Sequence, residues 1–135
     1  NIGDMVLFSG GRHYSGAESE TPTGNIRTAG AAQVTNIAEG TAHPIHLIGD
    51  GSNVYGWVNE NTVFPYSEGE TAQTSKALRL LESPKSDNIL TVIPYGEKFI
   101  VFREFRNGKG GTVRKAAYDG NLGFIEAGDF YLVEK

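Results

Sequence analysis

The three histidines are the residues whose type most readily suggests chemistry. His43 and His46 stand three positions apart in the stretch HPIHL, a spacing that could hold a metal ion. On an extended strand, residues i and i+3 point to opposite faces, so the two rings should not converge. A complete site would also need His13 from a distant segment, together with Asp4 or Asp50. We therefore expect no metal and no other cofactor, and assign the histidines to hydrogen bonding with a ligand.

The usual signatures of a hydrolase are missing from the sequence. The chain has no Cys, no Gly-x-Ser-x-Gly and no His-Glu-x-x-His. Its carboxylates lie in polar segments rather than in the apolar setting that a general acid needs. We predict that this chain is not itself an enzyme.

Aromatic side chains fall at predicted strand ends and beside loops, at Tyr14, Tyr55, Trp57 and Tyr66. Because side chains alternate along a strand, Tyr55 and Trp57 share one face, and Val54 and Val58 share the other. The valines are the more natural core residues, which would leave Tyr55 and Trp57 outward. The alternative, with Trp57 in the core, stays open. Flat aromatics on a wet face can stack on sugar rings or peptide planes.

One basic segment stands out, FREFRNGKGGTVRK at residues 102–115, with five cations and one carboxylate. Arg106 and Lys109 lie at its glycine-rich turn and could contact phosphate groups. The alternative is a solvated hairpin tip whose cations protect a strand edge.

The elements that must position these residues are short. Eighteen glycines in 135 residues separate brief runs rich in β-branched and aromatic residues, which is typical of many strands joined by tight turns. The runs are MVLF (5–8), QVTNIA (33–38), IHLI (45–48), VYGWV (54–58), TVF (62–64), ALRLL (77–81), ILTVI (89–93), KFIVFREF (98–105), TVRKAAY (112–118), LGFI (122–125) and FYLV (130–133). We predict an all-β fold. A helix over residues 71–81 remains an alternative, because periodicity cannot settle a short apolar run.

Charge and apolar length exclude two kinds of partner. The net charge is −4, since residues 1–66 carry six acids and two bases, and residues 67–135 carry ten of each. Nucleic-acid binding, which favours a basic surface, is therefore not expected. No run of 18 apolar residues occurs, so no membrane insertion is expected either.

The chain contains an internal repeat. Gly56, Trp57 and Val58 match Gly123, Phe124 and Ile125, and each group follows an Asp-Gly turn. Anchored there, the alignment pairs Leu47 with Ala116, Val34 with Ile100 and Tyr14 with Leu80. The polar stretch FPYSEGETAQTS, residues 64–75, is the natural connector. The repeat therefore predicts two units, residues 1–66 and 67–135. A solenoid is not expected, because it needs more than two copies.

The second unit resembles the bacterial SH3-like family through Ser83-Pro84, Gly96, Gly123-Phe124-Ile125 and Tyr131-Leu132. It departs from that family in the longer RNGKGG turn, and in Val113 where the family often has Trp. The first unit, through GGRHY, HPIHL and VYGWV, resembles the wall-binding modules at the C-terminal end of phage endolysins and cell-wall amidases.

This resemblance implies two small SH3-like barrels in tandem that bind the Gram-positive cell wall without catalysis. The expected partners are peptidoglycan or teichoic acid, and an N-terminal peptidoglycan hydrolase domain in a longer chain. A phage endolysin of this kind would be made in the host cytoplasm, released at lysis, and would act at the outer face of the wall. The residues we assign to ligand binding are His13, Tyr14, His43, Tyr55, Trp57, Arg106 and Lys109. An alternative is that one barrel mainly forms a homodimer or interaction surface and only the other binds.

Overall fold

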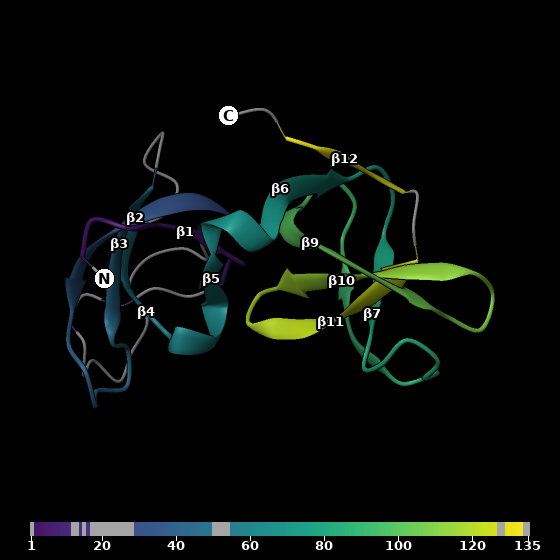
Figure 1. Ribbon diagram of the computed structural model, residues 1–135, viewed down its shortest axis with the longest axis horizontal. Coiled ribbons are helices and arrows are strands. Elements are labelled where there is room, and N and C mark those ends of the chain that lie inside the picture. The colour runs from purple at the N-terminus through teal and green to yellow at the C-terminus, as the bar shows by residue number, and fades with distance from the viewer. Residues whose placement is uncertain are drawn as a thin grey trace.

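The computed structural model describes residues 2–11, 14, 16, 29–49, 55–126 and 129–133, which form two antiparallel sheets side by side (Figure 1). The first sheet has the strand order β4-β3-β2-β1-β5. Its strands are β1 (Met5–Phe8), β2 (Gly30–Ile37), β3 (Ile45–Gly49), β4 (Tyr55–Val58) and β5 (Val63–Pro65). The 3-10 turn η2 (Glu60–Thr62) precedes β5.

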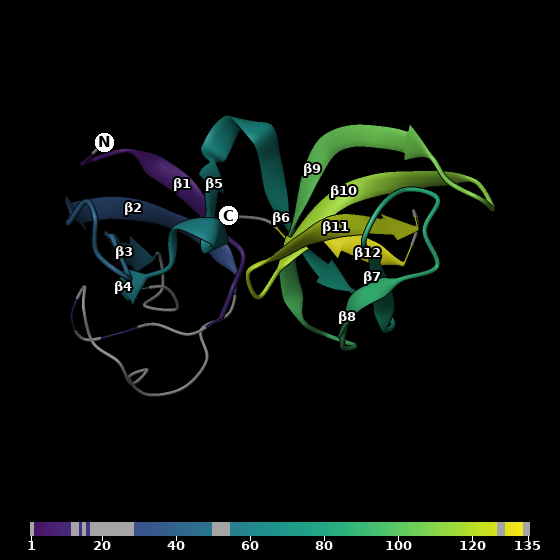
Figure 2. The ribbon, with the colours of Figure 1, turned by 90° about the horizontal axis from the view of Figure 1, so that it is seen from below.

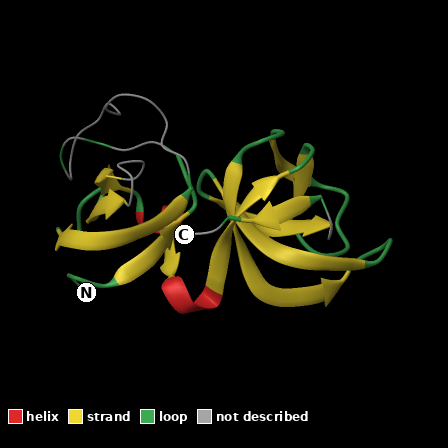
Figure 3. Ribbon diagram, turned by 90° about the horizontal axis from the view of Figure 1, so that it is seen from above, coloured by secondary structure: helices red, strands yellow, loops and turns green. Residues whose placement is uncertain are grey.

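The second sheet begins after the 3-10 turn η3 (Tyr66–Glu68), which links β5 to β6 (Figure 3). Its order is β12-β6-β9-β10-β11-β7-β8. The strands are β6 (Gly69–Thr74), β7 (Leu78–Leu81), β8 (Ile89–Ile93), β9 (Lys98–Asn107), β10 (Thr112–Tyr118), β11 (Asn121–Glu126) and β12 (Phe130–Leu132).

The prediction of an all-β fold is confirmed, and the alternative of a helix over residues 71–81 is wrong. Half of the predicted connector is also misassigned, because residues 69–74 form β6, which pairs with both β9 and β12. Over the part of the chain that the structure describes, neither sheet closes into a barrel. The two predicted barrels are instead two open sheets.

The two sheets repeat one strand order and one register. The series β5-β1-β2-β3-β4 matches β12-β6-β9-β10-β11, and β7 and β8 are added beyond β11. Across the first sheet, Val34 pairs with Leu47, which pairs with Gly56. The corresponding row in the second sheet is Val101, Ala116 and Gly123. The register therefore agrees with the aligned pair Leu47 and Ala116, and moves the partner of Val34 by one residue, from Ile100 to Val101.

Each sheet has its own buried core, and a third cluster joins the two. Val34, Leu47 and Val58 lie in the first core, with Phe8 and Ala32. The junction cluster contains Leu7, Ala29, Ile100, Phe102 and Ala117. In β1, Phe8 faces the first core and Leu7 faces the junction, so the run is buried on both faces. β9 is likewise buried on both faces, with Val101 in the second core and Ile100 in the junction cluster. β5 and β6 lie beside this junction (Figure 2).

Candidate ligand-binding face

An aromatic row crosses the first sheet on the face opposite its core. Tyr14 bridges Trp57 on the outer side of β4, with backbone hydrogen bonds of 2.8 Å and 2.9 Å in the two directions. Trp57 in turn lies directly opposite His46 of β3. Because residues directly opposite in antiparallel strands project to the same face, Tyr14, Trp57 and His46 form one row. Val58, the next residue along β4, is 1% exposed in the core, so the outward placement of Trp57 is the one that the structure has.

The His46–Trp57 pair is the close type of antiparallel pair. Both the N–H and the C=O of Trp57 bond to Tyr14, so neither is directed toward β3. A non-hydrogen-bonded pair brings its side chains closer together than a hydrogen-bonded one. The two rings meet edge to face, with their centroids 5.2 Å apart and their planes at 70°.

His46 is oriented by Thr35, which lies at the irregularity in the β2–β3 register between Val34 and Asn36. The hydroxyl of Thr35 is 2.6 Å from Nδ1 of His46 and 3.2 Å from the His46 backbone oxygen. Since the hydroxyl has one proton, donating it to the carbonyl leaves the Nδ1–H of the ring to donate to Thr35. In the tautomer that satisfies both contacts, Nε2 is the acceptor nitrogen. Burial lowers the pKa of His46 below its ordinary 6.5, so the ring is neutral at pH 7.

His43 closes one end of the row. Its ring stacks on Tyr14 with a centroid separation of 3.4 Å and an interplanar angle of 8°, and it is 8% exposed. Nδ1 of His43 lies 2.6 Å from Oδ1 of Asn59, an oxygen that can only accept. Asn59 is held by η2, because Thr62 donates to its backbone oxygen from both its N–H and its hydroxyl. The turn that carries Asn59 also touches the second sheet, where Asn61 donates to Gly120.

The prediction for the histidine pair assumed that both residues lie on one strand, and the structure differs on that point. His43 lies in the bend before β3 rather than in the strand, so strict alternation does not apply to it. The His43 ring reaches the row by stacking on Tyr14, and the His46 ring is part of the row, yet the two rings bond different partners, Asn59 and Thr35. Within the described residues, no group of three or more His, Cys, Asp and Glu side chains is placed to hold a metal ion.

Of the seven residues assigned to ligand binding, three come together: Tyr14, His43 and Trp57. His13 lies outside the described residues, and Tyr55 begins β4 while its side chain lies outside the description. Sequence reasoning named neither Asn59 nor Thr35, and it expected the histidines to bond a ligand without including His46 among the seven residues. Alternation was a usable signal for His46, because an inward Leu47 in the apolar run IHLI turns its neighbour His46 outward, beside Trp57.

Arg106 and Lys109 belong to the second sheet and do not join the row. Arg106 forms an ion pair with Glu104 at 2.6 Å, and Lys109 forms one with Asp87 at 2.6 Å. Lys115, from the same basic segment, lies 3.8 Å from Glu104. Nearby carboxylates therefore offset much of the positive charge that made this segment a candidate for binding phosphate.

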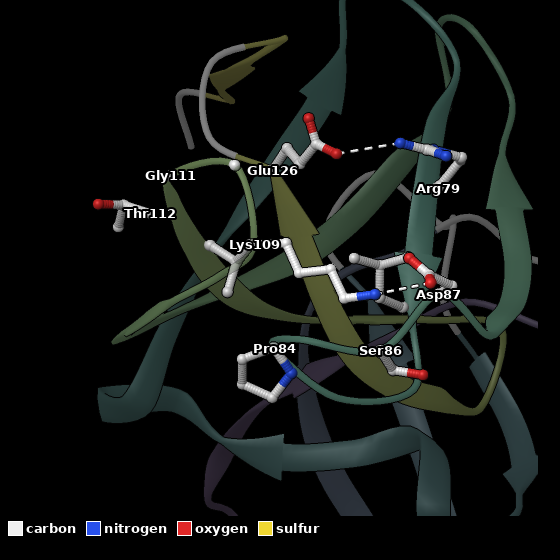
Figure 4. Close-up of a pocket in the computed structure, with 11 residues that line it drawn as sticks. Arg79, Pro84, Ser86, Asp87, Lys109, Gly111, Thr112 and Glu126 are labelled. Carbon is white, nitrogen blue, oxygen red and sulfur yellow. Dashed lines mark hydrogen bonds and ion pairs between the residues drawn. The ribbon is translucent and has the colours of Figure 1, made fainter.

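In the second sheet, a pocket of about 380 Å³ lies beside the positions that correspond by register to Tyr14, Asn59 and His43 (Figure 4). Leu81 pairs with Phe124 as Tyr14 pairs with Trp57. Glu126 corresponds to Asn59, because each lies two positions after its aromatic residue. Thr112 corresponds to His43, because each lies three positions before the residue opposite that aromatic, Lys115 or His46. The second-sheet members of these three pairs, Leu81, Thr112 and Glu126, all line the pocket. A ring stack on one sheet thus corresponds to a cavity on the other.

No helix in the described part of the chain is long and apolar enough to cross a membrane. Comparison of the sequence and structure with models of protein families, with characterised proteins and with solved structures gave no match. The function is therefore inferred from the geometry of the face and from its residues.

Proposed function

We propose that the chain is a tandem pair of SH3-like modules that attaches a peptidoglycan hydrolase, without catalysis of its own, to the Gram-positive cell wall. The ligand lies along the row Tyr14, Trp57 and His46. Its sugar rings or peptide planes stack on the aromatic rings, and its N–H and O–H groups donate to histidine nitrogen.

The strand order supports the SH3-like assignment. In each unit an opening strand, β1 or β6, is followed by a long excursion before a central pair of strands, β2–β3 or β9–β10. A strand with Gly, an aromatic and a β-branched residue comes next, and a short strand ends the unit. This is the order that the resemblance implies, in an open and curved form. The opening strand of the second unit is β6, one strand earlier than the run ALRLL.

The observation that carries the proposal is the outward row itself. Trp57, the single tryptophan of the chain, is held between Tyr14 and His46 on a face that the first core does not need. A flat, rigid aromatic surface loses little conformational freedom on binding. Each contact with a repeating polymer is weak, and two modules on one chain add avidity through effective concentration.

The test is a fluorescent fusion of residues 1–135 mixed with purified Gram-positive walls, before and after acid removal of teichoic acid. We expect binding to survive the acid treatment, and Trp57→Ala to reduce it about tenfold or more, since stacking contributes about 1–3 kcal/mol. The matched control is Phe124→Ala, the same register position in the second sheet, which should retain most of the binding.

Two results would change the proposal. Binding that disappears with the teichoic acid moves the ligand to that polymer, and Arg106 and Lys109 become the residues to substitute. Absence of binding to a panel of such walls rejects attachment as the function.

A second candidate function, self-association through the second unit, is favoured by edge strand β8. Ile89, Leu90 and Val92 are 45%, 42% and 46% exposed on this strand, and no charged residue interrupts ILTVI. An uncharged apolar edge strand offers backbone groups and side chains to another strand. Light scattering at increasing concentration should then show dimers that Val92→Lys abolishes. A constant monomer mass would reject this function and leave the wall-binding proposal intact.

A further inference from the structure

The pocket of the second sheet combines a few apolar lining residues with a charged rim. Leu81, Pro84 and Val113 provide the apolar lining, and Leu81 and Val113 are 8% and 3% exposed. The turn at Gly110 and Gly111 forms one side, where Gly110 has open space around it. A volume of about 380 Å³ is at the small end of the range for ligand sites, of a size for a peptide of two or three residues.

Four charges of alternating sign surround this pocket (Figure 4). Arg79 pairs with Glu126 at 3.0 Å, and Lys109 pairs with Asp87 at 2.6 Å. Lys109, and more weakly Arg79, hold the pKa of Asp87 below its usual range, so Asp87 lies within the field of both cations. The rim therefore carries no net charge and presents two cations and two carboxylates in turn.

The ion pairs on this rim are readily exchanged for pairs with a ligand. All four side chains are more than half exposed, and surface ion pairs of this kind contribute little to stability. A ligand ammonium can take the place of a cation beside Glu126 or Asp87. A ligand carboxylate can likewise accept from Arg79 or Lys109, and the planar guanidinium of Arg79 suits a carboxylate well.

We propose that this pocket is a second ligand site that takes a short peptide bearing both a free amino group and a free carboxylate. The site is independent of the aromatic row, because its residues lie on the other sheet. It also does not depend on the wall-binding function, because a free peptide in solution is sufficient to test it.

The charge arrangement disfavours a polyanion at the same site. A phosphate polymer would meet Glu126 and Asp87 as well as the two cations, and the like charges would offset the attraction. A zwitterion satisfies both signs at once. The pocket therefore favours a zwitterion over a polyanion, whereas the basic composition of residues 102–115 alone does not distinguish these two ligand classes.

The experiment uses the chain of residues 1–135 labelled with ¹⁵N and titrated with Ala-Ala-Ala. We expect saturable shifts at the amides of Ser86, Gly110, Gly111 and Thr112, and no saturable shift at the Trp57 indole. The N-acetylated peptide and the C-terminal amide should each bind about threefold to fivefold more weakly, as expected when one exposed ion pair is lost. Glycerol phosphate should bind more weakly than the free tripeptide.

Three variants fix the location of the site. Thr112→Trp places a ring at the position that corresponds to His43, and should abolish the shifts. Arg79→Gln should weaken binding about threefold to fivefold, whereas Lys76→Gln, which removes a cation of a surface ion pair outside the pocket, should not. Spectra and thermal unfolding establish that each variant is folded. Three results would overturn the proposal. A tripeptide that is both N-acetylated and C-terminally amidated could bind as tightly as the free tripeptide, glycerol phosphate could bind more tightly than the free tripeptide, or millimolar peptide could give no saturable shifts.

Discussion

The first and second sheets share a framework and differ on their outer faces. Val34, Leu47 and Gly56 correspond to Val101, Ala116 and Gly123, and these inward rows are buried throughout. Outward, the row Tyr14, Trp57 and His46 corresponds to Leu81, Phe124 and Lys115. Packing thus restricts the inner face to apolar side chains of suitable size, whereas the outer face can differ in chemistry.

The shared glycine of the two rows is required for two different reasons. Gly56 has φ of +112°, a backbone conformation that side chains disfavour. At Gly123, a Cβ would lie 2.3 Å from the backbone oxygen of Leu81, because β7 crosses there. The same residue at the same register position therefore serves backbone geometry in one unit and close approach of a strand in the other.

The largest predicted loss of stability comes from a substitution at the junction that both units share. Phe102 is 3% exposed in the cluster with Leu7, and it meets Phe64 edge to face at 5.1 Å. Phe102→Ala should lower the free energy of unfolding by about 3–5 kcal/mol. Urea unfolding followed by Trp57 fluorescence and by far-UV circular dichroism measures this loss, and the two probes should give one midpoint.

The control for that prediction is Phe105→Ala, since Phe105 is 51% exposed on the same strand. It should change the free energy of unfolding by less than about 1 kcal/mol. If Phe102→Ala left the Trp57 transition unchanged, the first unit would be independent of the junction and the shared cluster would not couple the two sheets.

Gly123 provides the next largest effect. Gly123→Ala forces apart β11 and β7 and should destabilise the chain by about 1–3 kcal/mol, with altered amide shifts at Leu80 and Leu81. Gly110→Ala, with open space around the glycine, should be nearly neutral. Chemical denaturation of the two variants measures the difference. Equal stability would show that β7 does not approach β11 as closely as the register implies.

His43→Thr gives the first unit the residue that the second unit has at the corresponding position, Thr112, and so measures what the ring stack contributes to stability. The variant loses the stack on Tyr14 and the hydrogen bond to Asn59, and should be less stable by about 1–2 kcal/mol. Thr112→Ala, on the exposed side of the pocket, should cost less than about 0.5 kcal/mol. A His43 variant as stable as the parent would mean that the ring stack does not stabilise the first unit.

The strands were predictable where burial selects apolar or β-branched runs. Each apolar run contains a strand within its described residues, including β1 and β9, whose continuous apolar character reflects burial on both faces. β6 was missed because its sequence, GETAQT, is polar. Its fully buried positions are the small residues Gly69, Ala72 and Thr74, and tertiary pairing with β9 and β12 makes it a strand.

The candidate face was predictable in part. Residue type and, for Trp57, alternation assigned Tyr14, His43 and Trp57 to one candidate site, and the structure brings the three together. The contribution of Thr35 depends on the irregularity in the β2–β3 register, which no local pattern marks. The role of Asn59 depends on η2 and on a bend that brings His43 back over Tyr14. Such long-range placements follow from the fold rather than from neighbouring residues in the sequence.

The smallest effect, and the most local, is the titration of His46 beside Trp57. Burial lowers the pKa of His46, so the folded state binds fewer protons there than the unfolded state. Its contribution to stability is therefore complete above about pH 6.5, the ordinary value, and is lost as the pH falls through the lowered pKa. The imidazolium formed beside the indole should quench Trp57 emission, with a midpoint below 6.5. Because the second sheet has no tryptophan, the signal reports the first unit alone.

His46→Gln should flatten the titration, whereas Thr35→Val, which removes the hydroxyl partner of Nδ1, should move its midpoint. A titration that persists unchanged in His46→Gln would assign the quenching to another group and remove His46 from the row.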